Sequence, residues 1–191
     1  MINKAIFLDR DGTLNYDYGY IKDPEKIKLF YEVEISLKLL KSSNFKLIIV
    51  SNQSGVARGY MSISQVNLIN KCLQEELSKL DISIDEIYIC PHHIEGKIKK
   101  YTIDCPCRKP KPGMLLEAKD KFNLDLSQSF LIGDKISDIG AGFNVGCKTV
   151  LVLTGYGKEE LERQKQWPYQ PNYIAKDLYS AASWITNHAL K

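Results

Sequence analysis

The sequence has no apolar run that approaches the roughly 18 residues needed for a membrane-spanning helix. Its first apolar stretch, residues 5–8, is stopped by Asp9, which makes it too short for a secretory signal peptide. The sequence also lacks internal repeats and low-complexity tracts. Its formal net charge is only +3, which by itself is too weak to indicate a nucleic-acid partner. We therefore expect a cytoplasmic protein that binds neither membranes nor nucleic acid.

The length and composition fit one globular domain. The 191 residues include 44% hydrophobic residues, enough to build a core, and 26% charged residues, as in ordinary soluble proteins. We expect a single domain over residues 1–191, with a loop insertion at about 90–107. We also expect a monomer, because the helical patterns leave no apolar face over.

Short apolar runs alternate along the chain with segments of helical spacing. The runs suit strands that are buried on both faces, and they cover residues 5–8, 47–50, 87–89, 130–132 and 149–153. The helical segments cover residues 33–44, 62–80, 112–122, 138–145 and 178–189. This alternation predicts an α/β fold with a doubly wound parallel sheet, in which ligands bind beyond the carboxyl ends of the strands.

Polar residues follow three of the predicted strands. Asp9 comes after the first strand, Ser51 after the second and Asp134 after the fourth. Because the carboxyl ends of parallel strands meet at one edge of the sheet, we expect these side chains to share a pocket.

The carboxylates of this pocket suggest a metal and a reaction. Asp9 and Asp11 are two residues apart in a loop, so they can face one pocket, where they repel each other unless a cation lies between them. Mg²⁺ fits, because it prefers oxygen ligands. Asp134 can complete such a site and Asp138, one helical turn later, can support it. One carboxylate could attack phosphorus while the other handles protons.

Donors for a phosphoryl group are also present. The Ser51 hydroxyl, the backbone amides of residues 52–55 and Lys109 could stabilise the charge that develops on its oxygens. Taken alone, the segment 9–13, Asp-Arg-Asp-Gly-Thr, could be an ordinary turn, because Asp, Gly and Thr are common in turns. The presence of Ser51, Lys109 and residues 133–134 in order makes that interpretation much weaker.

With these four motifs the sequence resembles the haloacid-dehalogenase-like phosphatases, whose signature is Asp-x-Asp-x-Thr after the first strand. The resemblance implies a Rossmann-like fold and an aspartyl-phosphate formed on Asp9. It implies that Asp11 protonates the leaving alcohol and then activates water. It also implies that Ser51 and Lys109 hold the phosphoryl group, and that Mg²⁺ binds to Asp9, Asp134 and the backbone carbonyl of Asp11.

A second cluster contains cysteine and histidine. Of the five cysteines, Cys90, Cys105 and Cys107 lie close in sequence to His92 and His93. In a cytoplasmic chain this clustering indicates a metal rather than disulfides. Three thiolates and one imidazole suit tetrahedral Zn²⁺ with no open position, which is typical of a structural site. The alternative is a set of buried free cysteines beside a surface histidine, and the spacing alone does not say which histidine is the ligand.

The resemblance extends to this cluster. A zinc-containing subgroup of these phosphatases carries Cys-x-His and Cys-x-Cys directly before an Arg-Lys-Pro segment, which here is residues 108–110. The resemblance implies that His92 is the ligand and His93 is not. It further implies that zinc holds the loop that directs Arg108 and Lys109 into the pocket.

Two zinc-loop subgroups come into question for the substrate. One hydrolyses D-glycero-D-manno-heptose 1,7-bisphosphate at the 7-phosphate, for the synthesis of nucleotide-activated heptose in lipopolysaccharide or other surface glycans; the other hydrolyses histidinol phosphate. The segments 17–21, Asp-Tyr-Gly-Tyr-Ile, and 51–59, Ser-Asn-Gln-Ser-Gly-Val-Ala-Arg-Gly, resemble the first subgroup. Both anomers at carbon 1 fit these motifs. Histidinol phosphate or another small phosphate ester stays an alternative. A zinc-containing binding module without turnover is disfavoured, because Asp9 and Asp11 are both intact.

Several residues could contact such a sugar bisphosphate. Arg108 could bind the second phosphate with two parallel hydrogen bonds, and Tyr18 and Tyr20 could flank the sugar unless they only pack their loop. Lys135 could contact the substrate or balance the charge of the metal site. No large cap domain fits between the first two motifs, because a helix already occupies that stretch. The expected substrate-binding residues are Asp17, Tyr18, Gly19, Tyr20, Ser51, Asn52, Gln53, Ser54, Arg108, Lys109 and Lys135.

Overall fold

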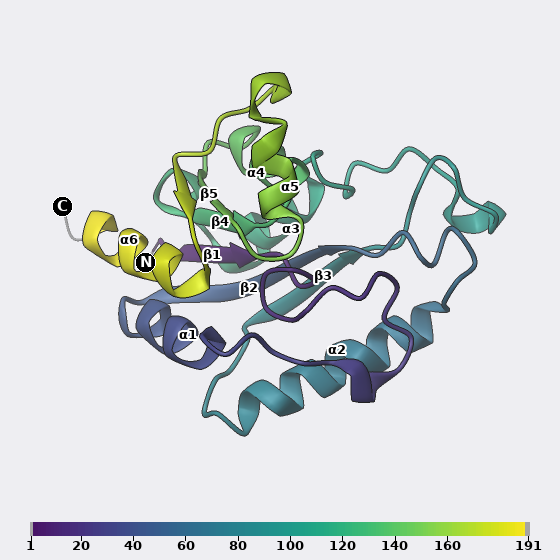
Figure 1. Ribbon diagram of the computed structural model, residues 1–191, viewed down its shortest axis with the longest axis horizontal. Helices are drawn as coiled ribbons and strands as arrows, with labels where there is room; N and C mark the ends of the chain where they lie inside the picture. Colours follow the sequence, from purple (N-terminus) through teal and green to yellow (C-terminus); the bar gives the residue numbers. More distant parts are fainter. Residues whose placement is uncertain (1, 190–191) are drawn as a thin grey trace.

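A six-stranded parallel sheet forms the centre of the computed structural model, which describes residues 2–189 (Figure 1). All neighbouring strands are parallel, and their spatial order is β3-β2-β1-β4-β5-β6. The strands are β1 Lys4–Leu8, β2 Phe45–Asn52, β3 Glu86–Cys90, β4 Phe130–Gly133, β5 Lys148–Val152 and β6 Tyr173–Ala175. The predicted doubly wound sheet is confirmed, and within residues 2–189 no large cap domain covers it.

Helices cover both faces of the sheet. The helices are α1 Val33–Ser42, α2 Ile63–Ser78, α3 Gly113–Phe122, α4 Ile136–Phe143, α5 Gly157–Glu162 and α6 Leu178–Ala189. Side chains of a strand alternate between the two faces. Ile6 and Leu8 therefore pack with α1, α2 and α6, whereas Ala5 and Phe7 pack with α3 and α4. Both faces are thus apolar, as a continuous apolar strand such as β1 predicts.

The end of the chain differs from the sequence prediction. Residues 155–171 look polar and irregular in the sequence, but the structure forms α5 there, and the short strand β6 follows at the sheet edge. Strand β6 has only three residues, of which Ala175 alone is buried, so no alternating pattern can reveal it. Helix α4 also begins at Ile136, earlier than predicted. No helix within residues 2–189 is long and apolar enough to cross a membrane.

The strand order places the site. The chain runs from β1 outward to β2 and β3, then crosses back to β4 on the other side of β1. A parallel sheet opens a crevice at such a change of direction, beyond the carboxyl ends of its strands. Asp9 leaves β1 at this point, and its backbone N–H still donates to Ile132 O of β4 at 2.9 Å. Two long loops, residues 9–32 and 91–112, border the same crevice.

Candidate active site and metal sites

The nucleophile candidate Asp9 contacts a lysine from the opposite half of the chain. Lys109 Nζ lies 2.8 Å from Asp9 Oδ1 and 2.6 Å from Asp138 Oδ1, and it donates to Val50 O at 2.6 Å. The residue is only 3% exposed. Burial alone lowers the pKa of Lys109, but Asp138 and Asp9 outweigh it and raise that pKa above its usual value. The ammonium group therefore stays charged beside the carboxylate that it serves.

Three carboxylates gather around this contact. Asp9, Asp134 and Asp138 each place an oxygen within 4.8 Å of the others, and all three are buried. Asp138 also caps α4, since its Oδ2 accepts from Lys135 N at 3.0 Å. Burial, and then the charge of Asp9, raises the pKa of Asp134 to about 8. Burial likewise raises the pKa of Asp138 to about 6, although Lys109 opposes it.

This group fits a hard divalent cation. Within residues 2–189, Asp134 Oδ1 is buried and has no hydrogen-bond partner. Among the described residues, two ammonium groups form ion pairs with these three carboxylates: that of Lys109, and that of Lys135, whose Nζ lies 3.9 Å from Asp134 Oδ2. Near these carboxylates, burial lowers the pKa of Lys135, but Asp134 and Asp9 raise it overall. An orphaned oxygen and an excess of buried negative charge are the environment in which Mg²⁺ binds through carboxylates.

Two glycines form a wall of this cluster. A Cβ on Gly12, whose φ is +88°, would lie 2.1 Å from Asp134 Oδ2, and a Cβ on Gly155, at φ +50°, would lie 2.2 Å from the same atom. Thr154 Oγ1 donates to Gly12 O at 2.7 Å, which ties the loop after β5 to the segment after β1. Glycine at position 12 thus allows the positive φ of the turn, and it leaves the space that the Asp134 carboxylate occupies.

The carboxylate of Asp11 does not join the other three. It lies against the Arg10 guanidinium instead, with Arg10 Nη2 to Asp11 Oδ2 at 2.6 Å. Asn15 Nδ2 and Gln53 Nε2 also donate to it, at 3.0 and 2.9 Å. Burial opposes ionisation, but the charge and hydrogen bonds of Arg10 hold the pKa of Asp11 below its usual value. The Asp11 carboxylate is therefore not part of the group formed by Asp9, Asp134 and Asp138.

The segment after β2 supports both Asp11 and Lys109. Gln53 Nε2 donates to Ser51 Oγ at 2.9 Å as well as to Asp11. Asn52 holds the backbone of Lys109 through two hydrogen bonds, from Asn52 Nδ2 to Lys109 O at 3.0 Å and from Lys109 N to Asn52 Oδ1 at 3.1 Å. Asn52 therefore positions the lysine, a contact that sequence reasoning did not foresee when it placed Asn52 against the substrate.

Most of the expected substrate-binding residues line one cavity of about 280 Å³. Lys135 lies at its edge, 3.4 Å from Asp17 Oδ2 and over the ring of Tyr156 at 4.4 Å. The expected residues that line it are Asp9, Asp11, Asp17, Gly19, Tyr20, Ser51, Asn52, Gln53, Ser54, Lys109, Lys135 and Asp138.

Two of the expected substrate-binding residues lie outside this lining. Tyr18 is 60% exposed and stacks towards Tyr16, with ring centroids 6.3 Å apart. Arg108 Nη1 donates to His92 O at 3.1 Å. Tyr18 therefore fits the alternative that it packs its own loop, and Arg108 is held at the base of the cysteine–histidine loop.

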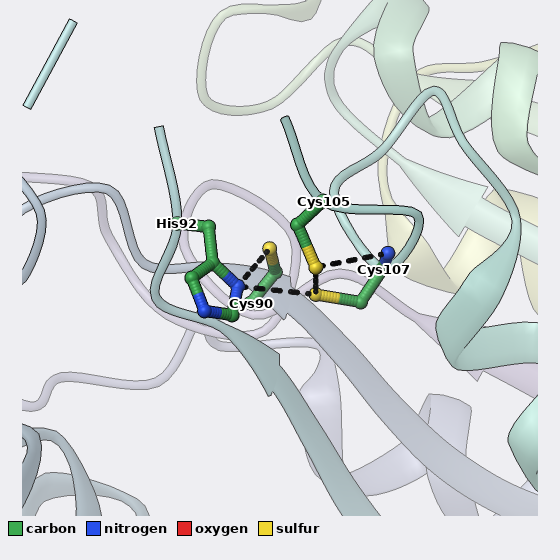
Figure 2. A group of neighbouring side chains, drawn as sticks. All are labelled: Cys90, His92, Cys105 and Cys107. Atoms are coloured by element: carbon green, nitrogen blue, oxygen red, sulfur yellow. Dashed lines mark hydrogen bonds between the residues drawn. The ribbon is translucent and has the colours of Figure 1, made fainter. Parts of the chain in front are cut away.

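The cysteine–histidine residues converge as Figure 2 shows. One ligand atom from each of Cys90, His92, Cys105 and Cys107 lies within 4.8 Å of the others. His92 Nδ1 is 3.7 Å from Cys90 Sγ and 3.6 Å from Cys107 Sγ, close to the edge of a tetrahedron with Zn–S bonds of about 2.3 Å. Cys105 Sγ and Cys107 Sγ are 2.8 Å apart, which is longer than a disulfide of about 2.05 Å and shorter than the other two separations. The donor set fits a closed tetrahedral Zn²⁺ site.

The second histidine points elsewhere. His93 Nδ1 accepts from Glu95 N at 3.0 Å, and His93 Nε2 lies 3.2 Å from Arg58 Nη2. His93 is therefore outside the cysteine group, as the family resemblance implies.

Comparison with known proteins agrees with this geometry. A family model described as "Polynucleotide kinase 3 phosphatase" matches residues 4–138, and one described as "HAD-hydrolase-like" matches residues 106–181. A D-glycero-β-D-manno-heptose-1,7-bisphosphate 7-phosphatase from Haemophilus influenzae is 48% identical over 155 residues, which cover 81% of this chain and 84% of the relative. The chain belongs to this family of haloacid-dehalogenase-like phosphatases.

Further members of the family match over nearly the whole chain. The enzyme of the same name from Escherichia coli K12 is 42% identical over 185 residues, 96% of this chain and 88% of the relative. The crystal structure of a D,D-heptose 1,7-bisphosphate phosphatase from B. bronchiseptica, complexed with magnesium and phosphate, superposes with a TM-score of 0.84 at 28% identity and covers 97% of this chain and 99% of the other. A HAD-like phosphatase structure from Mesorhizobium loti gives a TM-score of 0.83 at 30% identity, over 98% of this chain and 86% of the other.

Besides the contact of Asn52 with Lys109, three further contacts of this phosphatase site were missed by sequence reasoning. Arg10 donates to the Asp11 carboxylate, Thr154 Oγ1 donates to Gly12 O, and Tyr156 N donates to Asp134 Oδ2 at 2.8 Å. The last two come from the loop after β5, which carries no charged residue and looked irregular. Arg10 stands inside the signature itself, where its position between two aspartates was the available signal.

The glycine wall predicts a selective effect on cation binding. In Gly12→Ala the new methyl group displaces Asp134, so we expect Mg²⁺ affinity in a calorimetric titration to fall by at least ~10-fold. Gly19→Ala is the matched control, because Gly19 has a similar φ of +84° but a Cβ there meets nothing within 4 Å. Equal losses in the two variants would mean that backbone strain, not the approach of Asp134, is responsible.

Proposed function

We propose that this chain hydrolyses the 7-phosphate of D-glycero-D-manno-heptose 1,7-bisphosphate through a phosphorylated Asp9. The observation that carries the proposal is the buried contact of Lys109 with Asp9, at the point where the sheet opens and beside an excess of carboxylates. The 48% identity to a heptose-bisphosphatase supports the choice of substrate. The bisphosphate is anionic, which the lysines at the cavity can attract.

The first step transfers the phosphoryl group to the protein. A carboxylate oxygen of Asp9 attacks phosphorus, and the bond between phosphorus and the sugar oxygen breaks. Asp11 gives its proton to the departing alkoxide, so that the alcohol leaves neutral. Lys109 and the Ser51 hydroxyl donate hydrogen bonds to the phosphoryl oxygens, and these bonds stabilise the negative charge that develops on the oxygens in the transition state.

The second step regenerates the protein. The Asp11 carboxylate takes a proton from a water molecule, and the water oxygen attacks phosphorus. The bond from phosphorus to Asp9 then breaks, inorganic phosphate leaves, and Asp9 returns to a carboxylate. Burial raises the pKa of Asp11, but the charge of Arg10 and the hydrogen bonds from Arg10, Asn15 and Gln53 together lower it, which favours the ionised form that this second step requires. For the first step, a donor such as Gln53 would have to release the carboxylate so that Asp11 can carry the proton.

Two cations complete the proposed site. Mg²⁺ would be held by Asp9, Asp134 and the carbonyl of Asp11, and when bound it neutralises charge on the phosphoryl oxygens. Zn²⁺ would be held by the four cysteine–histidine ligands in a structural role. Since Arg108 and Lys109 follow Cys107 directly, a fixed cysteine group fixes the stretch of chain that delivers Lys109 to Asp9.

The rest of the substrate would lie along the cavity. Lys135 and Tyr20 line its wall and could contact the sugar or the second phosphate. Arg108 would need to exchange its hydrogen bond with His92 O for one with the second phosphate. Its guanidinium suits that task, because it can donate two parallel hydrogen bonds to one phosphate. We further propose that the chain works as one domain and as a monomer.

A specificity profile tests this proposal. We expect kcat/KM for D-glycero-D-manno-heptose 1,7-bisphosphate to exceed that for fructose 1,6-bisphosphate and for histidinol phosphate by at least ~10²-fold, since a buried polar site discriminates strongly against a poorly matched substrate. Phosphate release from each is measured under the same conditions. Asp9→Asn, which removes the nucleophile, should lower release by at least ~10³-fold while the fold is kept. A preference for histidinol phosphate would overturn the substrate assignment but not the chemistry.

The cysteine–histidine group generates a separate prediction. We expect one zinc ion per chain in metal analysis of purified protein, and we expect Cys105→Ser to lose it and to lower the free energy of unfolding by about 2–4 kcal/mol. Cys72→Ser is the matched control, because Cys72 lies in α2 and outside the ligand group. The control should keep its zinc and stay within about 0.5 kcal/mol of the wild type. Wild-type protein without zinc would contradict the assignment.

A further inference from the structure

Arg10 is among the most completely buried large side chains of the protein, with 1% of it exposed. Its guanidinium forms a fork on Asp11, from Nε to Oδ1 at 3.1 Å and from Nη2 to Oδ2 at 2.6 Å. The remaining terminal nitrogen, Nη1, donates to Asn70 Oδ1 of α2 at 2.8 Å. The arginine therefore joins the carboxylate of the loop after β1 to a helix that packs against the sheet.

The carboxylate of Asp11 is saturated by donors. Asn15 Nδ2 reaches Oδ1 at 3.0 Å, and Gln53 Nε2 reaches Oδ2 at 2.9 Å. With the two bonds from Arg10, these donors use all of the about four lone-pair sites that a carboxylate offers. A proton can enter or leave Asp11 only if one donor gives way.

The four donors are not equivalent. Gln53 lines the active-site cavity and also touches Ser51 Oγ, so an arriving phosphoryl group can compete for its amide. Arg10 and Asn15 do not line the cavity, and both are buried. Water cannot replace them there, and a buried guanidinium is costly to leave unpaired. Arg10 is thus a fixed partner, whereas Gln53 is the donor that faces the reaction.

We propose that Arg10 is a positioning residue for the reaction: its fork fixes the plane of the Asp11 carboxylate so that the Oδ2 lone pair now held by Gln53 faces the leaving group and later the attacking water. The inference rests on the proposed function of Asp11. A planar fork suits this task better than a point charge, because two parallel bonds fix direction as well as distance.

The two chemical steps depend differently on Asp11, and this gives the test. An alkyl phosphate needs a proton from Asp11 when its phosphorus–oxygen bond breaks. p-Nitrophenyl phosphate does not, because p-nitrophenolate is stable as the anion that takes the bonding electron pair. Hydrolysis of the aspartyl-phosphate needs Asp11 to take a proton from water for either substrate. A mispositioned Asp11 therefore slows both steps for the alkyl ester but only the second step for the nitrophenyl ester.

The experiment uses Arg10→Met in rapid-mixing kinetics with Mg²⁺ present. With p-nitrophenyl phosphate we expect a burst of nitrophenolate stoichiometric with enzyme, followed by a steady state that is slower than in wild type by at least ~10²-fold. With D-glycero-D-manno-heptose 1,7-bisphosphate, the proposed substrate and an alkyl ester, we expect no burst and a similar fall in kcat with little change in KM. A parallel fall of the first turnover and of the steady state with the nitrophenyl ester would overturn the inference, as would rates within about threefold of wild type.

Two further variants keep the test valid if Arg10→Met does not fold. Arg10→Lys keeps the charge but not the fork, and Asn70→Ala removes only the third contact of the guanidinium. Both should show the same burst with smaller losses of steady-state rate. Asn67→Ala, an exposed change on the same helix, is the matched control and should behave as wild type. Absence of a burst in folded Arg10→Lys and Asn70→Ala would also overturn the inference.

The proposed function can fail separately. If wild-type protein hydrolyses neither ester, or if Asp9→Asn still gives a burst, the aspartyl-phosphate mechanism fails and the inference falls with it. If wild type turns over both esters and Asp9→Asn gives no burst, while Arg10→Met is indistinguishable from wild type, the role of Arg10 alone is wrong.

Discussion

The ammonium group of Lys109 lies buried between the carboxylates of Asp9 and Asp138, and it donates a hydrogen bond to the backbone carbonyl of Val50 in β2. This one group joins β1, β2 and the helix after β4, which are the elements that meet where the sheet changes direction. Burial of such charges costs more than the pairing returns unless further partners are present. Lys109 has such partners, whereas Asp134 Oδ1 has no hydrogen-bond partner in the part of the chain that the structure describes, and the pKa of Asp134 is raised. A divalent cation could therefore bind at Asp134.

The lysine is delivered by a stretch of chain that has almost no regular structure of its own. Residues 91–112 contain one short 3₁₀ turn and depend on other contacts for their shape. Asn52 holds the backbone of Lys109 from the side of the sheet, and the cysteine–histidine group brings Cys90 and His92, at the start of the loop, together with Cys105 and Cys107 near its end. The cysteine–histidine group is linked to the carboxylate site through the short chain from Cys107 to Lys109, and also through Cys90, whose carbonyl accepts from Gln53 N at 2.8 Å. Within residues 2–189 the cysteine–histidine group and the carboxylate group share no residue.

Sequence reasoning reached the parts of the site that follow from strand ends. Asp9, Ser51 and Asp134 lie together because a parallel sheet brings its carboxyl ends to one edge, and a continuous apolar run such as residues 5–8 is a clear signal of a buried strand. It did not reach contacts made by backbone or by neutral side chains, such as Tyr156 N on Asp134 or Asn52 on Lys109, because no pattern of charge or spacing marks them. It also expected the Asp11 carboxylate near Asp9 and a cation. In the structure the Asp11 carboxylate binds the Arg10 guanidinium instead, because this adjacent cation attracts it whereas the carboxylate of Asp9 would repel it.

The most direct test of this account is a crystal structure of the protein with Mg²⁺ and beryllofluoride, which mimics a phosphoryl group on a carboxylate. We predict beryllium bonded to Asp9, its fluorides within hydrogen-bond distance of Lys109 and Ser51, and Mg²⁺ bound to Asp9, Asp134 and the Asp11 carbonyl. The Asp11 carboxylate should remain on the fork of Arg10. A cation bound to the Asp11 carboxylate, with Asp9 unmodified, would contradict the assignment of nucleophile and acid–base residue.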